Sequence, residues 1–574
     1  MSTDYKSTLF LPRTDFPMKA GLPAKEPGLL DRWEGMDLFA RQREQSKDCE
    51  KFILHDGPPY ANGNLHIGHA MNKILKDVIS RSQQMMGKNA HYVPGWDCHG
   101  LPIEWKIEEK YRKAGKDKDQ VPVVEFRKEC RDFATHWVGV QKEEFKRLGV
   151  IGDWERPYTT MSFDAEAQIV RELHKFLMNG GLYRGSKPVM WSPVEKTALA
   201  EAELEYHDHT STTIHVRFPV KSGAEEFMGG SIVIWTTTPW TMPGNRAISY
   251  GPDMEYVGIE VKEVAEGSLA VVGEKLFVAI ELLEEVQKEA GIAAADVIWR
   301  GKGDAFKGVL CLHPFNGQGY DFDVPLIDGD HVTVDAGTGF VHTAPGHGQE
   351  DYEVGMIHGI EVPHTVDEDG TFYDHVPMFA GQHVYKCNDG VADELEKVGA
   401  LLKRGKLVHS YPHSWRSKAP LIFRNTSQWF ISMETNDLRE KALKAIGETK
   451  WFPASGRNRI HSMIASRPDW VLSRQRAWGV PITVFTHKET GELLRDEKVN
   501  ARIEEIMEAE GSDAWFDSPA QRFLGNDYNA DDYDMAMDIL DVWFDSGCTH
   551  AFTLEARPEL QWPASLYLEG TDQH

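Results

Sequence analysis

Two histidines separated by three positions mark the first place in the chain where the residue types suit chemistry. His66 and His69 follow a turn rich in Pro, Asn and Gly, and Gly68 lies between them. If a helix begins here, its free N-terminal amides and its dipole suit a phosphate. Imidazoles donate hydrogen bonds to an oxyanion that develops at phosphorus, and Gly68 lets a nucleotide approach the backbone. On so short a pattern, two surface histidines that cap a helix are an equally good interpretation.

A second dense stretch runs from Gly95 to Pro102. Its Asp97 has the charge to hold a substrate ammonium, and the glycines on either side permit a close approach. A turn in which Asp97 caps the backbone is the alternative interpretation.

The elements that must position these residues follow from the hydrophobic pattern. Residues 51–55 form a short apolar run that stops at an Asp-Gly-Pro-Pro breaker, which is typical of a strand. A helical stretch follows with Lys73, Lys76 and Asp77 outside its apolar face. The members of that face are Ile67, Met71, Ile74, Val78 and Met85. A strand, a Gly-rich turn and a helix open a mononucleotide-binding βαβ unit.

In the rest of the chain the predicted secondary-structure pattern changes twice. Residues 104–150 are charged and helical in pattern, whereas from about residue 190 to about 410 short β-rich runs alternate with Gly-rich breaks. After Gln428 the two patterns mix again. We therefore expect an α/β protein with a separate β-rich domain, preceded by an extended arm with a short helix. The β-rich runs include residues 216–220, 231–235, 256–261 and 269–272.

Composition narrows the class of protein. Of 574 residues, 41% are hydrophobic and 26% are charged, which excludes a disordered, collagenous or small disulfide-stapled protein. The net charge of −26 excludes a general basic coat, so any nucleic acid must bind at local patches. The basic candidates, each interpreted first as solvated or structural, are Lys187, Arg416, Lys418, Arg424, Arg457, Arg459, Arg474 and Arg476.

The cysteines, the N-terminus and the length of the apolar runs indicate the cellular compartment of the protein. The chain has six cysteines and no C-x-x-C pair, so neither a disulfide framework nor a structural zinc site is expected. The N-terminus lacks the apolar core of a signal peptide, and no apolar run has the length of a membrane span. We expect a cytoplasmic protein with no membrane partner.

Several motifs together resemble one family. H-I-G-H after P-P-Y-A-N-G, with G-W-D-C-H-G-L-P-I-E downstream, resembles the class I aminoacyl-tRNA synthetases, and in particular their bacterial isoleucyl branch. The valyl and leucyl members share H-x-G-H but carry different residues in the second stretch. Further motifs of the family recur in order at residues 235–241, 337–348, 473–481, 541–547 and 569–574.

The resemblance implies a fold. It is a Rossmann-like α/β catalytic domain, split by a large β-rich inserted editing domain. The implied domains are residues 1–50 as an N-terminal arm, 51–194 as the first catalytic half, 195–415 as the editing domain, and 416–574 as an incomplete second half.

The resemblance also implies an activity, which is the activation of L-isoleucine with ATP and Mg²⁺ and its transfer to tRNA(Ile). His66 and His69 would stabilise the phosphates in the transition state, where positioning and charge dominate. Trp543 has an alternative interpretation as an aromatic residue of the hydrophobic core. The implied adenylate site comprises Asn62, Gly68, Glu569, Asp572 and Gln573, and the amino-acid site Pro58, Asp97 and Trp543.

An apolar pocket for isoleucine cannot firmly reject valine. The family itself is the standard example: one methylene is worth only about 1–3 kcal/mol, so a second, hydrolytic site is needed. On a strand, Thr236 and Thr238 share a face and Thr237 points away. By resemblance, Asp351 holds the ammonium of the mischarged amino acid, and His342 limits the pocket or contacts the tRNA end. The implied editing residues are Thr236, Thr237, Thr238, Asn245, His342 and Asp351.

Each editing residue also has a plain structural interpretation. A Thr-rich strand is ordinarily β-propensity, and Asn245 is an ordinary turn residue.

Two departures from the family pattern affect these expectations. Residues 191–197 lack the cysteine pair that some relatives carry, so we expect no zinc here, and zinc only in a C-terminal part. No K-M-S-K-S loop or anticodon-binding domain occurs within the 574 residues. We therefore expect a monomeric part of a longer chain that activates isoleucine poorly or not at all and retains hydrolysis of mischarged tRNA.

Four alternatives remain open from the residues. They are a valyl or leucyl ligase of the same class, an H-x-G-H nucleotidylyltransferase, a non-catalytic tRNA-binding relative, and a hydrolase that only edits. The long insert argues against the second, and intact His66, His69 and Asp97 argue against the third.

Overall fold

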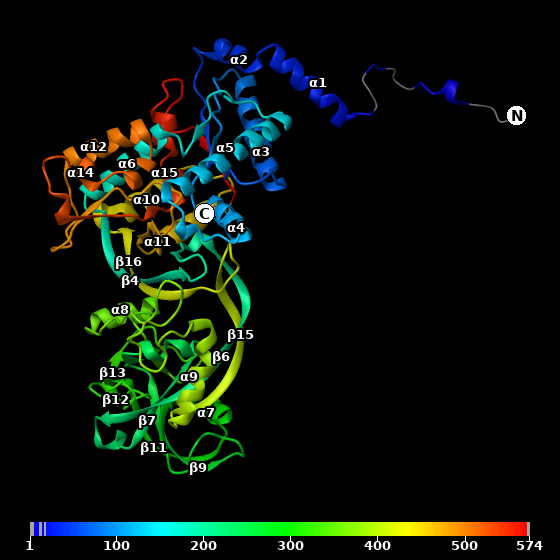
Figure 1. Cartoon of the computed structure of the whole chain (residues 1–574). Coiled ribbons are helices and arrows are strands. Elements are labelled where there is room, and N and C mark those ends of the chain that lie inside the picture. Colours follow the sequence, from blue (N-terminus) through cyan, green and yellow to red (C-terminus); the bar gives the residue numbers. More distant parts are fainter. Residues whose placement is uncertain (1–4, 11–13, 16–18, 571–574) are drawn as a thin grey trace.

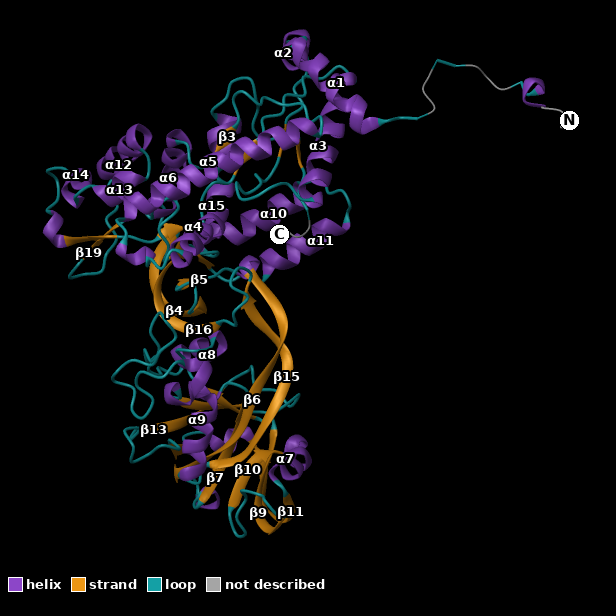
Figure 2. Ribbon diagram, turned by 45° about the vertical axis from the view of Figure 1, so that its right-hand side comes forward, coloured by secondary structure: helices purple, strands orange, loops and turns teal. Residues whose placement is uncertain are grey.

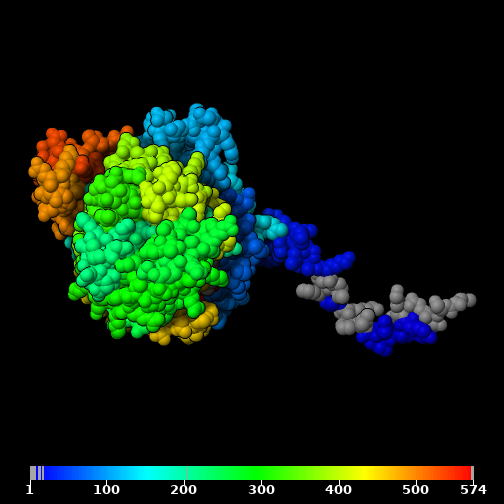
Figure 3. Space-filling model, turned by 90° about the horizontal axis from the view of Figure 1, so that it is seen from below, coloured from blue at the N-terminus to red at the C-terminus, as the bar shows by residue number. Residues whose placement is uncertain are grey.

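A computed structural model describes residues 5–10, 14–15 and 19–570. Figure 1 shows a helix-rich block and a β-rich block, joined by long strands. The chain enters the β-rich block after β4 and returns before β16, so the predicted α/β organisation with a β-rich insertion is confirmed. Seen from below, the β-rich block is one rounded mass, and helix α1 projects to the side (Figure 3).

The helix-rich block opens with strands that pair in parallel. Strand β1 pairs with β22 in register Leu54↔Leu566, and β2 pairs with β3. Parallel strands need helical crossovers, which α3 to α6 provide. The elements of this part are α1 (Leu22–Gly35), α2 (Leu38–Ser46), β1 (Leu54–His55), α3 (Ile67–Met85), β2 (Gly95–Trp96), α4 (Leu101–Lys113), α5 (Val123–Arg147), β3 (Tyr158–Thr159) and α6 (Phe163–Met178).

After the insertion, the chain completes this block with short strands and helices. They are α10 (Leu438–Glu448), α11 (Ser455–Ala465), β18 (Ser473–Arg474), β19 (Phe485–His487), α12 (Glu497–Glu510), α13 (Asp513–Asp517), α14 (Ala520–Leu524), β20 (Tyr533–Met535), β21 (Ile539–Leu540), α15 (Val542–Gly547) and β22 (Leu566–Tyr567).

A four-stranded antiparallel sheet connects the two blocks, in the order β17-β16-β4-β5. Strands β4 (Leu182–Ser192) and β16 (Ile422–Ile431) pair along their length, so both crossings of the chain pass through this sheet. Its outer strands are β5 (Thr197–Ala198) and β17 (Trp470–Val471).

The β-rich block is built on a ten-stranded sheet in the order β11-β9-β10-β7-β14-β8-β13-β12-β6-β15. Strands β6 and β15 form the long antiparallel ribbon that runs up to the helix-rich block (Figure 2). Its elements are β6 (Leu204–Ser222), β7 (Gly230–Thr236), η5 (Pro239–Gly244), β8 (Ala247–Tyr250), β9 (Glu255–Val264), β10 (Lys275–Ala279), α7 (Leu283–Ala290), β11 (Ile292–Lys302), β12 (Leu310–Leu312), β13 (Asp323–Asp328), β14 (Phe340–Thr343), α8 (Gln349–Ile357), α9 (Val384–Lys397) and β15 (Leu401–Ser414).

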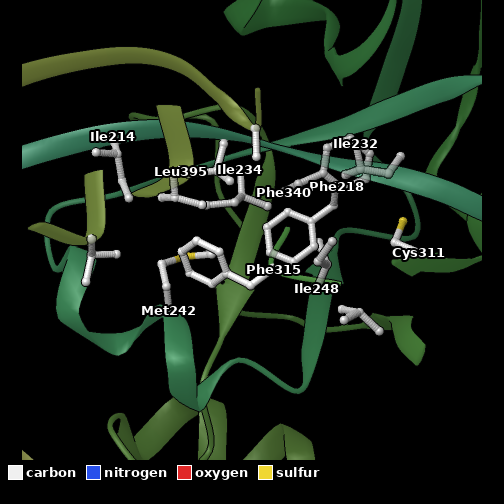
Figure 4. Close-up of a cluster of buried hydrophobic side chains, with 14 of the residues drawn as sticks. Ile214, Phe218, Ile232, Ile234, Met242, Ile248, Cys311, Phe315, Phe340 and Leu395 are labelled. Atoms are coloured by element: carbon white, nitrogen blue, oxygen red, sulfur yellow. The ribbon is translucent and has the colours of Figure 1, made fainter. Parts of the chain in front are cut away.

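A hydrophobic core fixes this sheet. Ile214 on β6 and Ile232 and Ile234 on β7 are fully buried, and Phe340 on β14 packs with them (Figure 4). Ile232 and Ile234 are two residues apart and therefore lie on one face of β7. Strand β7 ends at Thr236, where the Thr-rich segment lies. The core that holds β7 therefore also sets the position of this segment.

The helix predicted after the Gly-rich turn is confirmed as α3, and its apolar face is largely exposed. Ile67 and Met71 are 86% and 63% exposed, whereas Lys73 and Lys76 are buried. The two lysines turn inward because both contact the buried carboxylate of Asp56, at 2.6 Å each. Periodicity identifies a face, and here an ion pair decides which face is buried.

Two further expectations need correction. The run Leu269–Val272 is not a strand, because residues 265–274 form turns between β9 and β10. The part before residue 51 contains the two helices α1 and α2 where one short helix is predicted. The helical prediction for residues 104–150 and the β-rich runs at 216–220, 231–235 and 256–261 are confirmed.

Candidate functional site

The two histidines of the first motif lie at the start of α3. His66 is the N-cap residue, and its Nδ1 accepts hydrogen bonds from the amides of Gly68 (3.1 Å) and His69 (3.4 Å). The amide of His66 donates to Nδ1 of His69 at 3.4 Å. The rings stack with their centroids 3.7 Å apart. Since both Nδ1 atoms accept, each neutral ring carries its proton on Nε2, which is left to donate to a ligand.

This geometry changes how the helix start serves an anion. The amides of Gly68 and His69 are taken by His66, so the expectation that they are free for a phosphate is wrong for these two groups. Burial lowers the pKa of His69 to about 4, and positive charge on His66 and Lys73 acts in the same direction. The His69 ring is therefore neutral near pH 7. A Cβ on Gly68 would lie 2.9 Å from Cε1 of His66, so glycine is required for this cap.

A buried ion cluster lies behind the helix start. Asp56, Lys73 and Lys76 are each at most 3% exposed, and Lys76 also lies 3.2 Å from Glu569. Glu569 accepts a hydrogen bond from the amide of Gly57 at 2.6 Å. The charges of Lys73 and Lys76 overcome the effect of burial and hold the pKa of Asp56 below its ordinary value. The cluster therefore ties the turn before α3 to the end of the described chain.

The amino-acid site predicted from the sequence comes together around Asp97. Its backbone pairs with the P-P-Y-A turn, since the amide of Asp97 donates to the carbonyl of Pro59 at 3.0 Å. Its Oδ2 accepts a hydrogen bond from the Ser546 hydroxyl at 2.6 Å, whereas its buried Oδ1 has no hydrogen-bond partner among the described residues. Pro58 is buried beside this pairing, and Trp543, half-buried, stands at the start of α15 with Ser546.

The structure places some of the remaining candidate residues of the adenylate site. Asn62 is half-buried and its side-chain amide donates to the carbonyl of Pro102 at 3.2 Å. Asp572 and Gln573 lie outside the described residues, so the structure places neither.

A cavity of about 350 Å³ opens beside the Thr-rich segment. Thr236 and Thr238 line it, as does Asp351. Strand β7 ends at Thr236 and Thr238 caps the next turn, η5, so the shared face predicted for these two residues is present at a strand end. Thr237 is not among the described residues that line the cavity.

The predicted editing histidine is held by a chain of hydrogen bonds. Asn245 donates one N–H to the carbonyl of Ala247 (2.9 Å) and the other to Nδ1 of His342 (2.8 Å). The proton of His342 is therefore on Nε2, which donates to the Thr241 hydroxyl at 3.0 Å. Thr241 in turn donates to the carbonyl of Thr238 at 2.8 Å. Burial lowers the pKa of His342 to about 3, so the ring is neutral.

Asn245 thus has a definite place in the structure. It is fully buried and does not reach the cavity itself, but it fixes the tautomer and orientation of His342, which does line the cavity. A lone Asn in a turn gave no sign of this, because the contact joins residues 97 positions apart.

Asp351 lies in the first turn of α8, and its Oδ2 accepts a hydrogen bond from the amide of Ala344 at 2.9 Å. Burial raises its pKa to about 6, opposed by this hydrogen bond. Burial makes the charged form of Asp351 unfavourable, and an ammonium group that binds beside it would stabilise that charged form.

Sequence reasoning missed several residues of the cavity. Trp240 and His347 line it, with ring centroids 4.8 Å apart, and His347 is fixed by the Phe423 carbonyl and the Thr365 hydroxyl. Trp240 and Thr241 lie inside the motif at 235–241, which was the available signal. The cavity also includes residues from β4 and β16, namely Met190, Ile422 and Phe423 with Leu421 before them. These belong to the connecting sheet, so the cavity lies where the β-rich block meets it.

The basic candidates are mostly committed to the fold. Arg474 is buried between Glu203 and Asp541 at 2.9 Å from each, and Arg476 is buried near Glu104 at 3.0 Å. Their structural interpretation is supported. Arg424 is also buried, Lys187, Arg416 and Lys418 bond or stack within the protein, and Arg457 and Arg459 lie exposed on α11.

Among the described residues, no group of three or more His, Cys, Asp or Glu side chains is arranged to hold a metal ion. None of the described helices is long and apolar enough to span a bilayer.

Comparison with known proteins identifies the family of this chain. The chain belongs to the class I tRNA synthetases, since the family model described as tRNA synthetases class I (I, L, M and V) matches residues 28–574. It is similar to the isoleucine–tRNA ligase of Pelagibacter ubique, with 56% identity over 570 residues that cover 99% of this chain and 62% of the relative. The ligase of the same name from Mesorhizobium japonicum is 55% identical and covers 100% of this chain and 62% of its own length.

The chain thus spans about 62% of the length of the curated relatives it matches. A solved LeuRS–tRNA–LeuAMS complex from Agrobacterium radiobacter is 17% identical, with a TM-score of 0.38, and covers 94% of this chain and 60% of that one.

Proposed function

We propose that this chain carries the two active sites of an isoleucine–tRNA ligase: one forms isoleucyl-adenylate from L-isoleucine and ATP, and the other hydrolyses valyl-tRNA(Ile). The observation that carries the proposal is the meeting of the P-P-Y-A-N-G turn, Asp97 and the start of α15 around one unsatisfied, buried carboxylate oxygen. The names of the relatives favour isoleucine over valine and leucine.

In the synthetic site, Asp97 binds the ammonium of isoleucine, and Pro58 and Trp543 contribute apolar surface for its side chain. The carboxylate of isoleucine attacks the α-phosphorus of ATP, and pyrophosphate leaves. The Nε2–H groups of His66 and His69 donate hydrogen bonds to phosphate oxygens whose charge grows in the transition state. Asn62, Gly68 and Glu569, with Asp572 and Gln573 beyond the described part, contribute to the adenylate pocket.

Magnesium belongs to the same proposal as an ion that neutralises the phosphate charge of ATP. Magnesium at ATP sites is held largely by the substrate phosphates and water, with few protein carboxylates. Zinc enters no step.

In the hydrolytic site, the cavity admits the valyl group at the tRNA end. Asp351 binds its ammonium, and the hydroxyls of Thr236 and Thr238 bind the ester and a water molecule. The water attacks the ester carbonyl, the ester C–O bond breaks, and valine and free tRNA leave. Since His342 is neutral and bonded at both nitrogens, it serves as an oriented wall of the cavity and not as a base.

The domain bounds and the setting complete the proposal. We take residues 1–50, 51–194, 195–415 and 416–574 as arm, first catalytic half, editing domain and second catalytic half. The cavity supports this division with one refinement, because β4 and β16 on either side of the insert contribute to its wall. The partners are then L-isoleucine, ATP and tRNA(Ile), acted on by a monomer in the cytoplasm.

Two assays test the two sites separately. Release of valine from valyl-tRNA(Ile), compared with release of isoleucine from isoleucyl-tRNA(Ile), tests the hydrolytic site. Pyrophosphate exchange into ATP with isoleucine, valine or leucine tests the synthetic site. Equal hydrolysis of both aminoacyl-tRNAs contradicts the editing role, and exchange that prefers leucine or valine contradicts the choice of substrate.

A further inference from the structure

A buried histidine outside the residues discussed so far joins the two walls of the amino-acid site. His99 follows Asp97 on the same loop and is 1% exposed. Its Nδ1 lies 2.8 Å from Oδ2 of Asp545 on α15, and its Nε2 lies 3.3 Å from Oε1 of Glu166 on α6. Its ring also meets that of Trp478 edge-on, with centroids 5.0 Å apart.

The charges around His99 favour its protonated form. Burial lowers its pKa, but the hydrogen bond to Asp545 and the negative charges of Asp545 and Glu166 outweigh burial and raise the pKa above the ordinary value. Glu166 has other partners, namely Arg131 at 3.0 Å and the amide of Ser512 at 2.7 Å. The remaining oxygen of Asp545 has no hydrogen-bond partner among the described residues. His99 is therefore the nearest counter-charge for Asp545.

Two parallel contacts tie the Asp97 loop to α15. Asp97 accepts from Ser546, and His99 pairs with Asp545, the neighbouring residue of the same helix. Trp543 stands one turn earlier on α15. Loss of the His99 contact would let the loop move relative to α15, and it would leave the charge of Asp545 facing Asp97. Like charges close together disfavour ionisation of both.

We propose that His99 is a positioning residue for amino-acid binding: by clamping its loop to α15 and neutralising Asp545, it keeps the Asp97 carboxylate charged and aimed at the substrate ammonium. The proposal rests on the synthetic site described under Proposed function. His99 contacts no substrate in this scheme and acts through Asp97.

The probe is L-isoleucinol, which keeps the ammonium and the side chain of isoleucine and lacks the carboxylate. Its affinity for the 574-residue chain is measured by calorimetry at pH 8, beside the affinity for ATP. We expect His99→Gln to weaken isoleucinol binding about tenfold or more, since a misplaced charged hydrogen bond costs about 1.5–3 kcal/mol. ATP affinity should stay within about twofold, because the clamp does not reach the His66 and His69 cap.

A matched control is available on α6. His174 is likewise buried and pairs with a carboxylate, Glu504, at 2.7 Å, but it has no contact with the Asp97 loop. His174→Gln should lower the melting temperature as His99→Gln does and leave isoleucinol affinity unchanged.

The pH dependence distinguishes a clamp with charge from a merely structural role. Burial already raises the pKa of Asp97, and the negative charges of Asp545 and Glu569 act in the same direction, whereas the Ser546 hydrogen bond and the positive charge of His99 oppose it. His99→Gln removes that charge, so isoleucinol affinity should fall more steeply than in the wild type between pH 8 and pH 6. Asp545→Asn replaces the charged contact with His99 by a neutral one, which weakens the clamp, and it also removes a negative charge near Asp97. It should weaken binding at pH 8 with a shallower pH dependence than His99→Gln, and it provides a second variant if His99→Gln does not fold.

Each outcome bears on one proposal. If the wild-type chain does not bind isoleucinol, the synthetic site itself is wrong and this inference ends with it. If the wild type binds and His99→Gln or Asp545→Asn binds equally well at every pH, the inference alone is wrong. Equal weakening by His99→Gln and His174→Gln likewise assigns His99 a structural role only.

Discussion

Hydrolysis of valyl-tRNA(Ile) should lose rate as the pH falls from 7 to 5, because Asp351 must be ionised to hold the substrate ammonium. Asp351 is a half-buried residue of α8 that lines the cavity, and desolvation of its carboxyl raises the pKa to about 6. A carboxyl with its ordinary pKa of 3.8 would remain almost fully ionised over this range.

The magnitude follows from that value. With a pKa of about 6, about 90% of Asp351 is ionised at pH 7 and about 10% at pH 5, so kcat/KM should fall about tenfold. The two histidines of the cavity do not add to this change. Burial lowers the pKa of His342 to about 3 and of His347 to about 4, so both rings stay neutral down to pH 5.

The assay is release of labelled valine under conditions where kcat/KM is measured, with circular dichroism at each pH to show that the fold persists. Asp351→Asn should give a flat profile and a rate at pH 7 that is about 10- to 100-fold lower, the value of a hydrogen bond to a charged group. A wild-type profile that is flat between pH 7 and pH 5 would refute the reasoning, as would Asp351→Asn with the full wild-type rate.

Two further predictions concern α3. Asp56→Asn should lower the free energy of unfolding by about 3–5 kcal/mol, because Lys73 is left buried without its paired carboxylate and Lys76 keeps only Glu569; urea titration measures it, and a loss below about 1 kcal/mol contradicts the ion cluster. Since the pKa of Asp56 lies below its ordinary value, the wild-type contribution is present above pH 4 or so and is lost only as the pH falls through the lower, folded pKa. Gly68→Ala should displace the His66 ring from its cap and slow ATP–pyrophosphate exchange about tenfold or more with little change in melting temperature; an unchanged exchange rate would show that the cap geometry does not matter.

The helix after the Gly-rich turn shows what the spacing of apolar residues can predict and what it cannot. Its existence and length follow from the spacing of apolar residues, and α3 confirms them. Its orientation does not follow, because a sequence gives no measure of what a distant carboxylate offers. Asp56 and Glu569 pull the lysine side inward, and Glu569 comes from the other end of the chain.

The cavity shows the same division within one site. The Thr-rich segment and His342 lie in the sequence motifs and Asp351 was implied by the family resemblance, and the structure brings Thr236, Thr238, His342 and Asp351 to one cavity. The role of Asn245 and the contribution of β16 were not visible, since hydrogen bonds and walls formed by residues far apart leave no local signal.

The sequence by itself determined the α/β organisation, the β-rich insertion and the residues that can do chemistry, because periodicity, breakers and side-chain types are local properties. Tertiary structure alone decided which face of α3 is buried, which nitrogen of each histidine carries the proton, and that Asp97 and Asp351 stand in surroundings that raise their pKa. The physical reason is that burial, desolvation and ion pairing depend on three-dimensional neighbours, and only the folded chain brings groups such as Asp97 and Ser546 within hydrogen-bond distance.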